Sequence, residues 1–463
     1  MRYIFVFALV ASMALPGDWP QFRGPNATGI GSGKNLPVEV GTGKNLLWKV
    51  AVPPGKSSPV LTADVLFLTA FEGKKLLTLC LDAKTGMPRW RRELIPDRTE
   101  YRSELNDPAS PSPATDGSNA YAFFGDFGLV SYDSQGRERW RLPLGPFHSL
   151  HGMAASPVLH GNTLFLLCDH DGPSFLLAVD KDTGKIRWRV ARPDVFSGFA
   201  TPVVFRPRSG PDQLLILGSY QLVSYSAASG EKLWWVSGFS VQSKSVPVTA
   251  EGVVYCAMRG TEAEGPGNFP QFSSALAQHD RNKDGKLQLD ETESFLYKSF
   301  AQVDRNGDGE IDEPEYERLR PLMNAETLVA AILPKGTGDL TNTAVLWRYR
   351  KGVPHVPSPL LYNGILYLVR EGGIVTSLDA KSGEVGRQAR ISGAPGDYLA
   401  SPIAAEDKIY TLSAEGKLGV LRPGLSWDVL AVSDLGEECY ATPAISKSCI
   451  YVRSSKSVMC FGS

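Results

Sequence analysis

Two twelve-residue segments of the chain carry the residue types and spacing that bind a divalent cation. Each has oxygen-bearing groups at positions 1, 3, 5, 7, 9 and 12 and a glycine at position 6. A hard cation such as Ca²⁺ takes this set of ligands, with a main-chain carbonyl at position 7 and a bidentate glutamate at position 12. The sequence therefore predicts two calcium sites. The predicted ligands are Asp280, Asn282, Asp284, Lys286, Gln288 and Glu291 in loop 1 and Asp304, Asn306, Asp308, Glu310, Asp312 and Glu315 in loop 2.

This spacing is that of the EF-hand loop, which joins two helices. Leu276 and Phe300 stand four residues before the loops, where the incoming helices are expected. Leu287 and Ile311 hold position 8 and are expected to pair in a short β-bridge. The loops start 24 residues apart, so one helix at about residues 292–303 is expected to leave loop 1 and enter loop 2. Loop 2 has four carboxylates and loop 1 has three, which predicts tighter binding in loop 2.

The elements that must position these loops come from a repeat. A Ser, Thr or Val followed by Pro opens an apolar stretch eight times. A second phrase, Asp-x-x-Thr/Ser-Gly with Trp four residues after the glycine, closes several units, and the Trp residues from Trp48 to Trp234 stand 42 to 50 residues apart. This period, with four short strands in each unit, is typical of β-propeller blades. The opening prolines are Pro59, Pro113, Pro157, Pro202, Pro247, Pro359, Pro402 and Pro443.

The two ends of the chain complete one blade. The unit that opens at Thr442 has room for three strands, and residues 45–50 form an orphan strand that contains a Trp. Joining them predicts an all-β fold, an eight-bladed β-propeller closed by an N-terminal strand. An open β-solenoid is the alternative, but it would not need this complementary pair of ends.

A small α-helical EF-hand insertion is expected in blade 5. Trp234 and Trp347 are separated by 113 residues, and removal of residues 262–325 leaves an ordinary blade. These residues contain both calcium loops. Bound calcium is expected to have a structural role, folding the insert onto the propeller. The expected domains are a signal peptide at 1–14, a propeller at 15–261 and 326–463, and an EF-hand pair at 262–325.

The first fourteen residues predict export. Arg2 precedes an apolar run from Tyr3 to Val10, and small residues follow at Ser12 and Ala14. This is the pattern of a secretory signal peptide, with a buried first strand or an anchor helix as the alternative. We therefore expect the protein to be periplasmic or extracellular.

The six cysteines fit an oxidising compartment without requiring one. No CxxC or CxxCH motif is present, which excludes a zinc ribbon and a c-type haem. Cys80, Cys168 and Cys256 stand in apolar runs, where buried thiols are expected. Cys449 and Cys460 flank an expected hairpin turn, and either a cross-strand disulfide or two free thiols fits this arrangement.

Composition excludes two classes of protein. The chain has 48 basic and 49 acidic residues, so it lacks the basic field of a nucleic-acid-binding protein. No run of 18 apolar residues occurs outside the N-terminus, which excludes a membrane-embedded protein. The near-zero net charge is the sum of two parts of opposite sign, since residues 262–325 carry a net charge of −7 and the remainder carries +6. The oligomeric state is not indicated.

A second candidate site is expected at one mouth of the central channel, where the loops before the inner strands converge. A mixed polar ring at a concave mouth fits a protein or small-molecule ligand, with ordinary solvated loop residues as the alternative. The spacing of His148 and His151 fits a metal or, alternatively, hydrogen-bonded loop histidines. No catalytic residue is predicted. The residues expected to bind the ligand are Arg102, Asp107, His148, His151, Lys244, His355, Tyr398, Glu438 and Tyr440.

The repeats, and residues 19–25 with the sequence Trp-Pro-Gln-Phe-Arg-Gly-Pro, resemble the pyrroloquinoline-quinone (PQQ) propeller superfamily. This superfamily includes quinoprotein dehydrogenases and BamB-type outer-membrane assembly factors. The resemblance covers nearly all of the chain after residue 18 and implies an eight-bladed propeller outside the cytoplasm. It allows PQQ as a cofactor, but the vicinal cysteine pair and the Glu/Asn/Asp calcium set of the dehydrogenases are not found. The lipid-bearing cysteine of BamB-type proteins is also missing.

The leading hypothesis is an exported calcium-binding β-propeller that acts as a non-catalytic binding or scaffold protein, with its ligand or partner at the channel mouth. One alternative is a PQQ-dependent quinoprotein oxidoreductase of the alcohol or sugar dehydrogenase type. The other is a BamB-like outer-membrane protein assembly factor.

Overall fold

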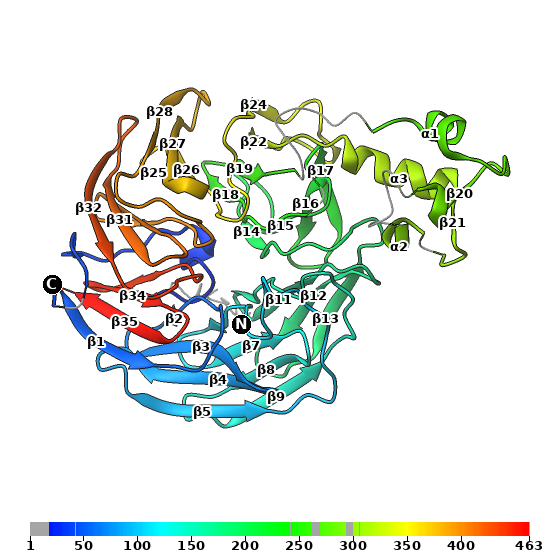
Figure 1. The fold of residues 1–463 in the computed structure, drawn as a ribbon. Helices are drawn as coiled ribbons and strands as arrows, with labels where there is room; N and C mark the ends of the chain where they lie inside the picture. The colour runs from blue at the N-terminus through cyan, green and yellow to red at the C-terminus, as the bar shows by residue number, and fades with distance from the viewer. Residues whose placement is uncertain are drawn as a thin grey trace, which may run out of the picture.

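The computed structural model describes residues 18–41, 43–240, 242–260, 269–292, 300–304 and 306–462. The expected signal peptide at residues 1–14 lies outside these ranges. The strands form a ring of eight sheets, and the helices lie at one side of the ring (Figure 1). The prediction of an eight-bladed β-propeller is confirmed.

Each blade contains four antiparallel strands, which are consecutive in the chain except in blades 5 and 8, and its first strand lines the channel. Blade 1 consists of β2 (Val60–Leu61), β3 (Val65–Glu72), β4 (Lys75–Asp82) and β5 (Pro88–Leu94). Blade 2 consists of β6 (Ala114–Thr115), β7 (Ala120–Phe124), β8 (Gly128–Tyr132) and β9 (Glu138–Pro143). Blade 3 consists of β10 (Val158–His160), β11 (Thr163–Cys168), β12 (Phe175–Asp180) and β13 (Ile186–Ala191). Blade 4 consists of β14 (Val203–Phe205), β15 (Gln213–Leu217), β16 (Gln221–Ser226) and β17 (Lys232–Ser237).

The other four blades follow the same plan. Blade 5 consists of β18 (Val248–Ala250), β19 (Val253–Met258), β22 (Leu328–Ile332) and β24 (Val345–Tyr349). Blade 6 consists of β25 (Leu360–Tyr362), β26 (Ile365–Arg370), β27 (Ile374–Asp379) and β28 (Val385–Arg390). Blade 7 consists of β29 (Ile403–Ala405), β30 (Lys408–Leu412), β31 (Lys417–Arg422) and β32 (Asp428–Asp434). Blade 8 consists of β33 (Ala444–Ser446), β34 (Cys449–Arg453), β35 (Ser457–Gly462) and β1 (Leu46–Ala51).

Blade 8 closes the ring, because its outer strand comes from the start of the chain. Strand β1 pairs antiparallel with β35, with Trp48 opposite Cys460 and Ala51 opposite Ser457. In Figure 1 the blue strand β1 lies beside the red strand β35. The predicted closure by an N-terminal strand is therefore confirmed.

The repeated Gly and Trp form a link between neighbouring blades. Gly86 has a φ of 74°, and a Cβ there would lie 2.5 Å from the Trp48 ring of the preceding blade. The indole N–H also donates to the next blade, as in Trp140 Nε1 to Lys181 O at 2.9 Å. This Trp–Gly link joins Trp48 to Gly86, Trp90 to Gly136, Trp140 to Gly184, Trp188 to Gly230 and Trp347 to Gly383.

The Ser or Thr before each opening proline forms a second link. Its hydroxyl accepts a hydrogen bond from the amide of the corresponding residue in the preceding blade, at 2.9 to 3.0 Å. Seven of the eight seams between blades have this hydroxyl link. The seven pairs, amide first, are Ser58–Ser112, Ser112–Ser156, Ser156–Thr201, Val246–Ser358, Ser358–Ser401, Ser401–Thr442 and Thr442–Ser58.

The seam between blades 4 and 5 is built differently. Val246 stands where a hydroxyl would accept from the amide of Thr201, and Trp234 bonds to Gln213 of its own blade instead of the next blade. Among the residues that the structure describes, this seam alone lacks both the hydroxyl link and the Trp–Gly link. A short strand of blade 5, β23 (Gly338–Asp339), pairs parallel with β17 and covers the outer edge of blade 4.

The insert lies between β19 and β22 of blade 5, and its helices are α1 (Phe272–His279), α2 (Phe300–Val303) and α3 (Glu313–Met323). Most of the helix expected at residues 292–303 lies outside the described ranges, although α2 forms its end. Strands β20 (Leu287–Gln288) and β21 (Glu310–Ile311) pair Leu287 with Ile311. The predicted β-bridge between the two loops is confirmed. Short 3₁₀ helices are η1 (Pro25–Ala27), η2 (Leu289–Glu291) and η4 (Glu371–Gly373).

The cysteines are free thiols in this structure. Strands β34 and β35 form the expected hairpin, but its register places Cys449 opposite Gly462 and Cys460 opposite Tyr451. The two cysteines are therefore not directly cross-strand, and of the two alternatives the structure has free thiols.

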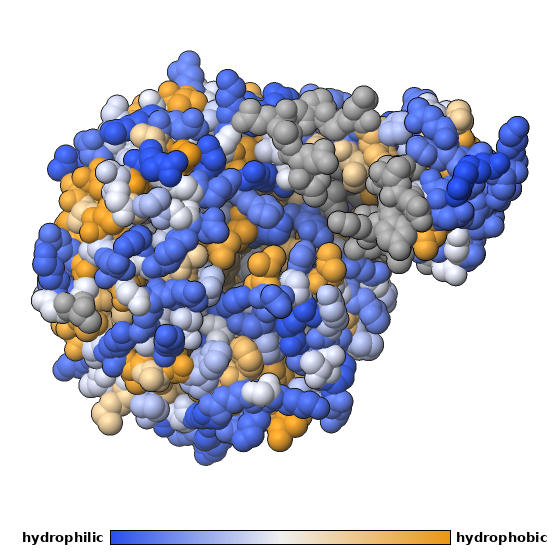
Figure 2. All heavy atoms as spheres, viewed as in Figure 1, coloured by the Kyte–Doolittle hydropathy of each residue, from blue (hydrophilic) through white to orange (hydrophobic). Residues whose placement is uncertain are grey.

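The face of the molecule seen in Figure 2 is largely hydrophilic, above all on the outer side of the insert. None of the described helices has the length and hydrophobicity needed to span a bilayer.

Candidate functional site

In loop 1, several of the predicted calcium ligands accept hydrogen bonds from amides of the loop itself. The Asp280 carboxylate at position 1 accepts hydrogen bonds from the amides of Lys283 (2.6 Å) and Gly285 (3.0 Å), which fold the loop back on itself. Lys283 and Gly285 have φ angles of 62° and 85°, which give the turn at positions 4 and 6. At position 12, Glu291 Oε1 accepts from the amide of Arg281 at 2.7 Å. The ends and middle of the loop thus face one another.

The side chains at positions 3, 5 and 9 of loop 1 also meet. Asn282 Nδ2 and Gln288 Nε2 each donate to Asp284 Oδ2 at 2.8 Å. The amide of Lys286 donates to Asp284 Oδ1 at 2.9 Å, and this bond lowers the pKa of the Asp284 carboxyl below its usual value. The Asp284 carboxylate is therefore charged and held within the loop.

Loop 2 repeats much of this geometry in its described residues. Asp304 accepts from the amides of Gly307 (2.8 Å) and Gly309 (3.0 Å), which have φ angles of 73° and 85°. Asp308 Oδ2 accepts from Asn306 Nδ2 at 2.9 Å. The remaining predicted ligands continue the pattern: Glu310 donates its amide to Asp308, and Asp312 and Glu315 bond to each other's amides.

The two loops are coupled at position 7. The side chains of Lys286 and Glu310 form an ion pair next to the Leu287–Ile311 bridge. Because both residues are expected to offer their main-chain carbonyls as ligands, the ion pair and the bridge fix the two ligand-bearing strands relative to each other.

The donor set fits a calcium ion, because each loop offers carboxylate, amide and carbonyl oxygens in the order that Ca²⁺ prefers. Within the described residues, however, no group of three or more His, Cys, Asp or Glu side chains is placed so as to hold a metal ion. Calcium binding at these twelve positions therefore stays a prediction.

The insert docks on blade 4 although its chain belongs to blade 5. Its apolar core includes Phe196, from the segment before β14, and Tyr220 packs against that core. Arg318 of α3 donates to Pro193 O at 2.5 Å and lies 5.8 Å from the Phe196 ring centre. These residues lie at the end of the blades from which the inner strands begin, so the insert stands beside the channel mouth.

The opposite end of the channel is crossed by residues 19–34, which we call the plug. The plug makes hydrogen bonds to seven of the eight blades, beginning with Trp19, whose amide and carbonyl pair with Leu61 of blade 1 at 2.9 and 2.8 Å. The other bonded residues are Thr115, Leu159, Val204, Pro359, Ala404 and Lys447, one from each of blades 2, 3, 4, 6, 7 and 8.

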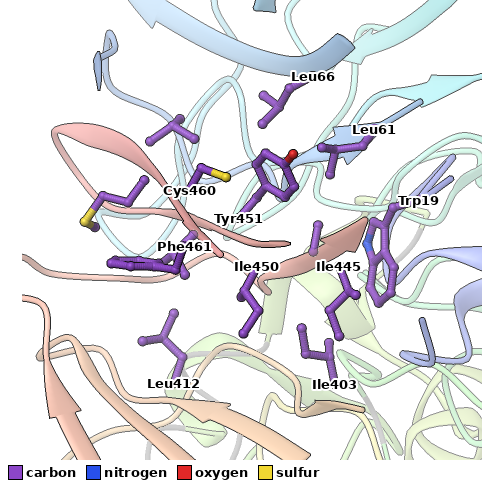
Figure 3. Packing of buried hydrophobic residues seen from close by; sticks show 14 of the residues in the cluster. Trp19, Leu61, Leu66, Ile403, Leu412, Ile445, Ile450, Tyr451, Cys460 and Phe461 are labelled. Carbon is purple, nitrogen blue, oxygen red and sulfur yellow. The ribbon is translucent and has the colours of Figure 1, made fainter. Parts of the chain in front are cut away.

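Apolar packing seals the plug where the ring closes. Figure 3 shows Trp19 beside Leu61, Ile445 and Ile403, which come from blades 1, 8 and 7. Trp19 is fully buried, and a Cβ at Gly24 would lie 2.7 Å from its ring. The glycine of the Trp-Pro-Gln-Phe-Arg-Gly-Pro segment is therefore required for this packing.

At the mouth, the structure brings together three of the predicted residues from blades 3, 5 and 6. Lys244 Nζ lies 2.9 Å from His355 Nε2. His151 packs against Phe199, whose amide donates to Ser243 O next to Lys244. Burial and the Lys244 charge lower the pKa of both histidines, and burial lowers the pKa of Lys244. This cluster is electropositive when Lys244 is protonated.

The other predicted mouth residues have partners of their own. His148 stands near His170, a buried histidine, with ring centres 6.5 Å apart. Arg102 pairs with the buried Asp126, and Asp107 accepts from the Ala109 amide at 2.8 Å. On the far side of the mouth Tyr440 donates to Glu438 at 3.1 Å, and Lys56 lies 5.2 Å from the Tyr440 ring centre.

Tyr398 is not at the surface of the mouth. It is buried in the core between blades 6 and 7, and its hydroxyl donates to Ala394 O at 2.9 Å. The loop that carries it folds back on itself, so the expectation that this side chain faces a ligand was wrong.

Sequence reasoning missed two buried arginines, Arg23 in the plug and Arg453 at the seam between blades 8 and 1. Arg23 of the plug donates to Pro359 O at 2.8 Å, and Arg453 donates to Thr69 O at 2.8 Å. Neither lies in the repeat phrases that were used to find sites. The one sequence feature that could have pointed to a role for Arg23 is its position within the Trp-Pro-Gln-Phe-Arg-Gly-Pro segment.

These features define an eight-bladed β-propeller with a plugged channel and an EF-hand insert. The family model described as outer membrane protein assembly factor BamB matches residues 28–172 and 173–265, slightly more than half of the chain. The chain therefore belongs to this family. The EF-hand family model matches residues 296–319, which contain loop 2. No curated protein matches the chain.

Solved structures show the same fold at low sequence identity. BamB from Moraxella catarrhalis is similar with a TM-score of 0.57 and 11% identity, over 90% of this chain and 99% of that one. The computationally designed Ika8 protein is similar with a TM-score of 0.54 and 10% identity, over 90% and 100%.

Proposed function

We propose that this protein is an exported, calcium-binding β-propeller that acts as a binding or scaffold protein and receives its ligand or partner at the channel mouth. The observation that carries this proposal is the plug. Because residues 19–34 bond to seven blades at one end of the channel, the end with the Lys244–His355 cluster is the one left for a ligand.

The family and the site both favour binding over catalysis. The chain belongs to a family named for an assembly factor, which supports a role in protein interactions. The six cysteines include no vicinal pair, so the chain lacks the feature that packs on PQQ in quinoprotein dehydrogenases. Export is supported by the signal-peptide pattern at residues 1–14.

Calcium has a structural role in this proposal. The two loops share a β-bridge and an ion pair, and their apolar core includes Phe196 beside blade 4. Ions bound in the loops would hold the insert against the propeller. Outside the cell, the two loops do not need the high calcium affinity of cytosolic sensors.

Calorimetry tests the calcium part of the proposal. We expect two Ca²⁺ ions to bind, and Asp280→Ala and Asp304→Ala each to remove one of them, because position 1 is a direct ligand in either loop. Asp290→Ala is the matched control, since Asp290 is the exposed residue before the position-12 glutamate and pairs with Arg281. Unchanged stoichiometry in both ligand variants would show that the loops do not bind calcium.

Two measurements test the mouth. Reconstitution with PQQ and Ca²⁺ should give neither a quinone absorbance band nor dye-linked oxidation of alcohols or sugars; either signal would favour the oxidoreductase alternative. Chemical crosslinking in extracytoplasmic extract should give a partner band with the wild type that Lys244→Met loses. Lys56→Met is the control, because Lys56 and Lys244 both stand three residues before an opening proline. Loss of the band in both variants would argue against the Lys244 cluster.

A further inference from the structure

We infer that Arg23 forms an anion-binding site inside the plugged end of the channel, for a small inorganic anion or a carboxylate group. The plug reaches blade 3 through Gln21, whose Oε1 accepts from the Leu159 amide at 3.2 Å. Two residues later, the Arg23 guanidinium reaches Pro359 O of blade 6. The plug therefore places this guanidinium within the ring, between blades 3 and 6.

The guanidinium has too few partners for a buried cation. Arg23 is fully buried, and in the described part of the chain its Nε and Nη1 have no hydrogen-bond partner. Burial lowers its pKa to about 9, so it stays charged at neutral pH, and among the described residues it forms no ion pair with a carboxylate. An unpaired buried charge is costly, and a bound anion would supply both the charge and the missing acceptors.

Arg453 shows how a buried arginine is held between blades 8 and 1 without an anion. It is also fully buried, but its Nη1 donates to the carbonyls of Ser57 (3.1 Å) and Thr69 (2.8 Å), and Nη2 donates to Pro53 O at 3.4 Å. Only its Nε lacks a partner within the described chain. Arg453 is therefore a control that is as buried as Arg23 but has more hydrogen-bond partners.

Thermal unfolding tests this site. Wild-type protein is compared in chloride, bromide, formate and a bulky sulfonate at equal ionic strength. We expect a higher midpoint temperature in the small anions, because a ligand that binds the folded state stabilises it. Arg23→Met should abolish this difference, whereas Arg453→Met should lower the midpoint in every salt and keep the difference. A response to halides alone identifies an inorganic anion, and a larger response to formate identifies a carboxylate site.

Crystals soaked in bromide give an independent readout, with an anomalous peak expected beside Arg23. The inference is overturned if the wild type unfolds at the same temperature in all salts, if Arg23→Met keeps the response, or if only water is found beside the guanidinium.

A different observation carries a second inference: we propose that the insert is a calcium-dependent clasp over the seam between blades 4 and 5. This rests on the calcium binding proposed above. Within the described residues, the seam lacks the hydroxyl link at Val246 and the Trp–Gly link at Trp234. Strand β23 joins the blades at the outer edge, where Trp234 is opposite Gly338.

The insert joins the same two blades beside the mouth. Its chain leaves blade 5 after β19 and returns at β22, while its core takes in Phe196 and borders Tyr220 at blade 4. The position-8 residues Leu287 and Ile311 belong to that core as well. Ligand binding at positions 7 and 9 would therefore order the residues that hold Phe196.

Hydrogen exchange tests the clasp. With calcium, we expect slow amide exchange at residues 193–199 and 218–222. With a chelator, the exchange rate at these residues should rise at least ~10-fold, which corresponds to a loss of about 1.4 kcal/mol in local stability. Exchange at the seam between blades 2 and 3 should stay unchanged. Phe196→Ala removes the contact without touching a calcium ligand. This variant should still bind calcium in calorimetry, but its exchange at 218–222 should no longer respond to calcium.

The outcomes separate the clasp from calcium binding itself. Calcium binding without any change in exchange at these residues overturns the clasp alone. No calcium binding in calorimetry overturns both. A calcium response of equal size at every seam would show a general stabilisation and would also overturn the clasp.

Discussion

At the scale of single residues, one glycine and one tryptophan make the link between most blades. The sequence indicates that the glycine takes a turn conformation and that the tryptophan packs on a neighbouring sheet. The structure shows that these two roles meet, because the Trp48 ring occupies the space beside Gly86 where a side chain would be. The repeated glycine and tryptophan are therefore explained by a contact between neighbouring blades and not by a contact within one blade.

Gly86→Ala is expected to lower the free energy of unfolding by roughly 2–4 kcal/mol, from the left-handed backbone and the clash with Trp48 together. Gly73→Ala is the control. Gly73 also has a positive φ, 57°, in the same blade, but a Cβ added there would have no other atom within 4 Å. It should cost about 1 kcal/mol. Chemical denaturation measures both, and equal losses would contradict the packing argument.

At the scale of elements, the closing strand β1 is held by one partly buried carboxylate. Glu437 pairs with Lys49 of β1 at 2.7 Å and accepts from Ser457 at the start of β35 at 2.7 Å. Burial by itself would raise the pKa of Glu437, but the Lys49 ion pair and the serine hydrogen bonds outweigh it and lower the pKa to about 2. The charged form therefore stabilises the closed ring.

The pH dependence follows from this shift. A carboxyl with a lowered pKa stabilises the fold above its unfolded pKa of 4.5, and this contribution is lost as pH falls toward 2. Glu437→Gln should lower the free energy of unfolding by about 1–2 kcal/mol at pH 7 after solvent screening, and by much less at pH 2. Glu438→Gln, at the exposed neighbour, should have little effect. A loss that does not vary with pH would contradict the role of the charge.

The hydroxyl links provide a prediction for the seams. Val246→Thr adds an acceptor for the Thr201 amide and should stabilise the protein by about 0.5–1.5 kcal/mol. Thr442→Val removes the acceptor of the Ser401 amide at a standard seam and should cost about 1–3 kcal/mol. Denaturation of both variants checks the pair, and no gain from Val246→Thr would show that the Thr201 amide is already satisfied.

At the scale of the whole molecule, two calcium ions would reverse the sign of the net charge. Without the proposed signal peptide, which contains Arg2, the chain has a net charge of −2, so uptake of two Ca²⁺ would bring it to about +2. Electrophoretic mobility at pH 7 should therefore change direction between chelator and calcium. The Asp280→Ala, Asp304→Ala double variant is the control: its net charge is near zero, and its mobility should be the same in both conditions. A change of mobility there would place calcium elsewhere.

The sequence predicted the ring because its evidence is periodic. Each blade repeats the same opening proline, and a missing fourth strand at Thr442 pointed to residues 45–50. The calcium loops were also visible, since all six ligand positions of each loop lie within twelve residues. Contacts such as Arg23 to Pro359 join positions 336 residues apart and leave no local pattern. Tyr398 failed for a related reason, because sequence does not show which side of a loop packs inward.

The pairing of β1 with β35 sets an order of events during folding. Strand β1 is among the first parts of the chain to be synthesised, and β35 is the last of the strands. The ring therefore cannot close until β35 has been synthesised, and until then β1 lacks its strand partner. Such long-range closure is slow, and exposed strand edges invite pairing between chains. Chaperone binding, or rapid closure once β35 has been made, would therefore matter more for this protein than for a propeller in which every blade is built from one continuous stretch of chain.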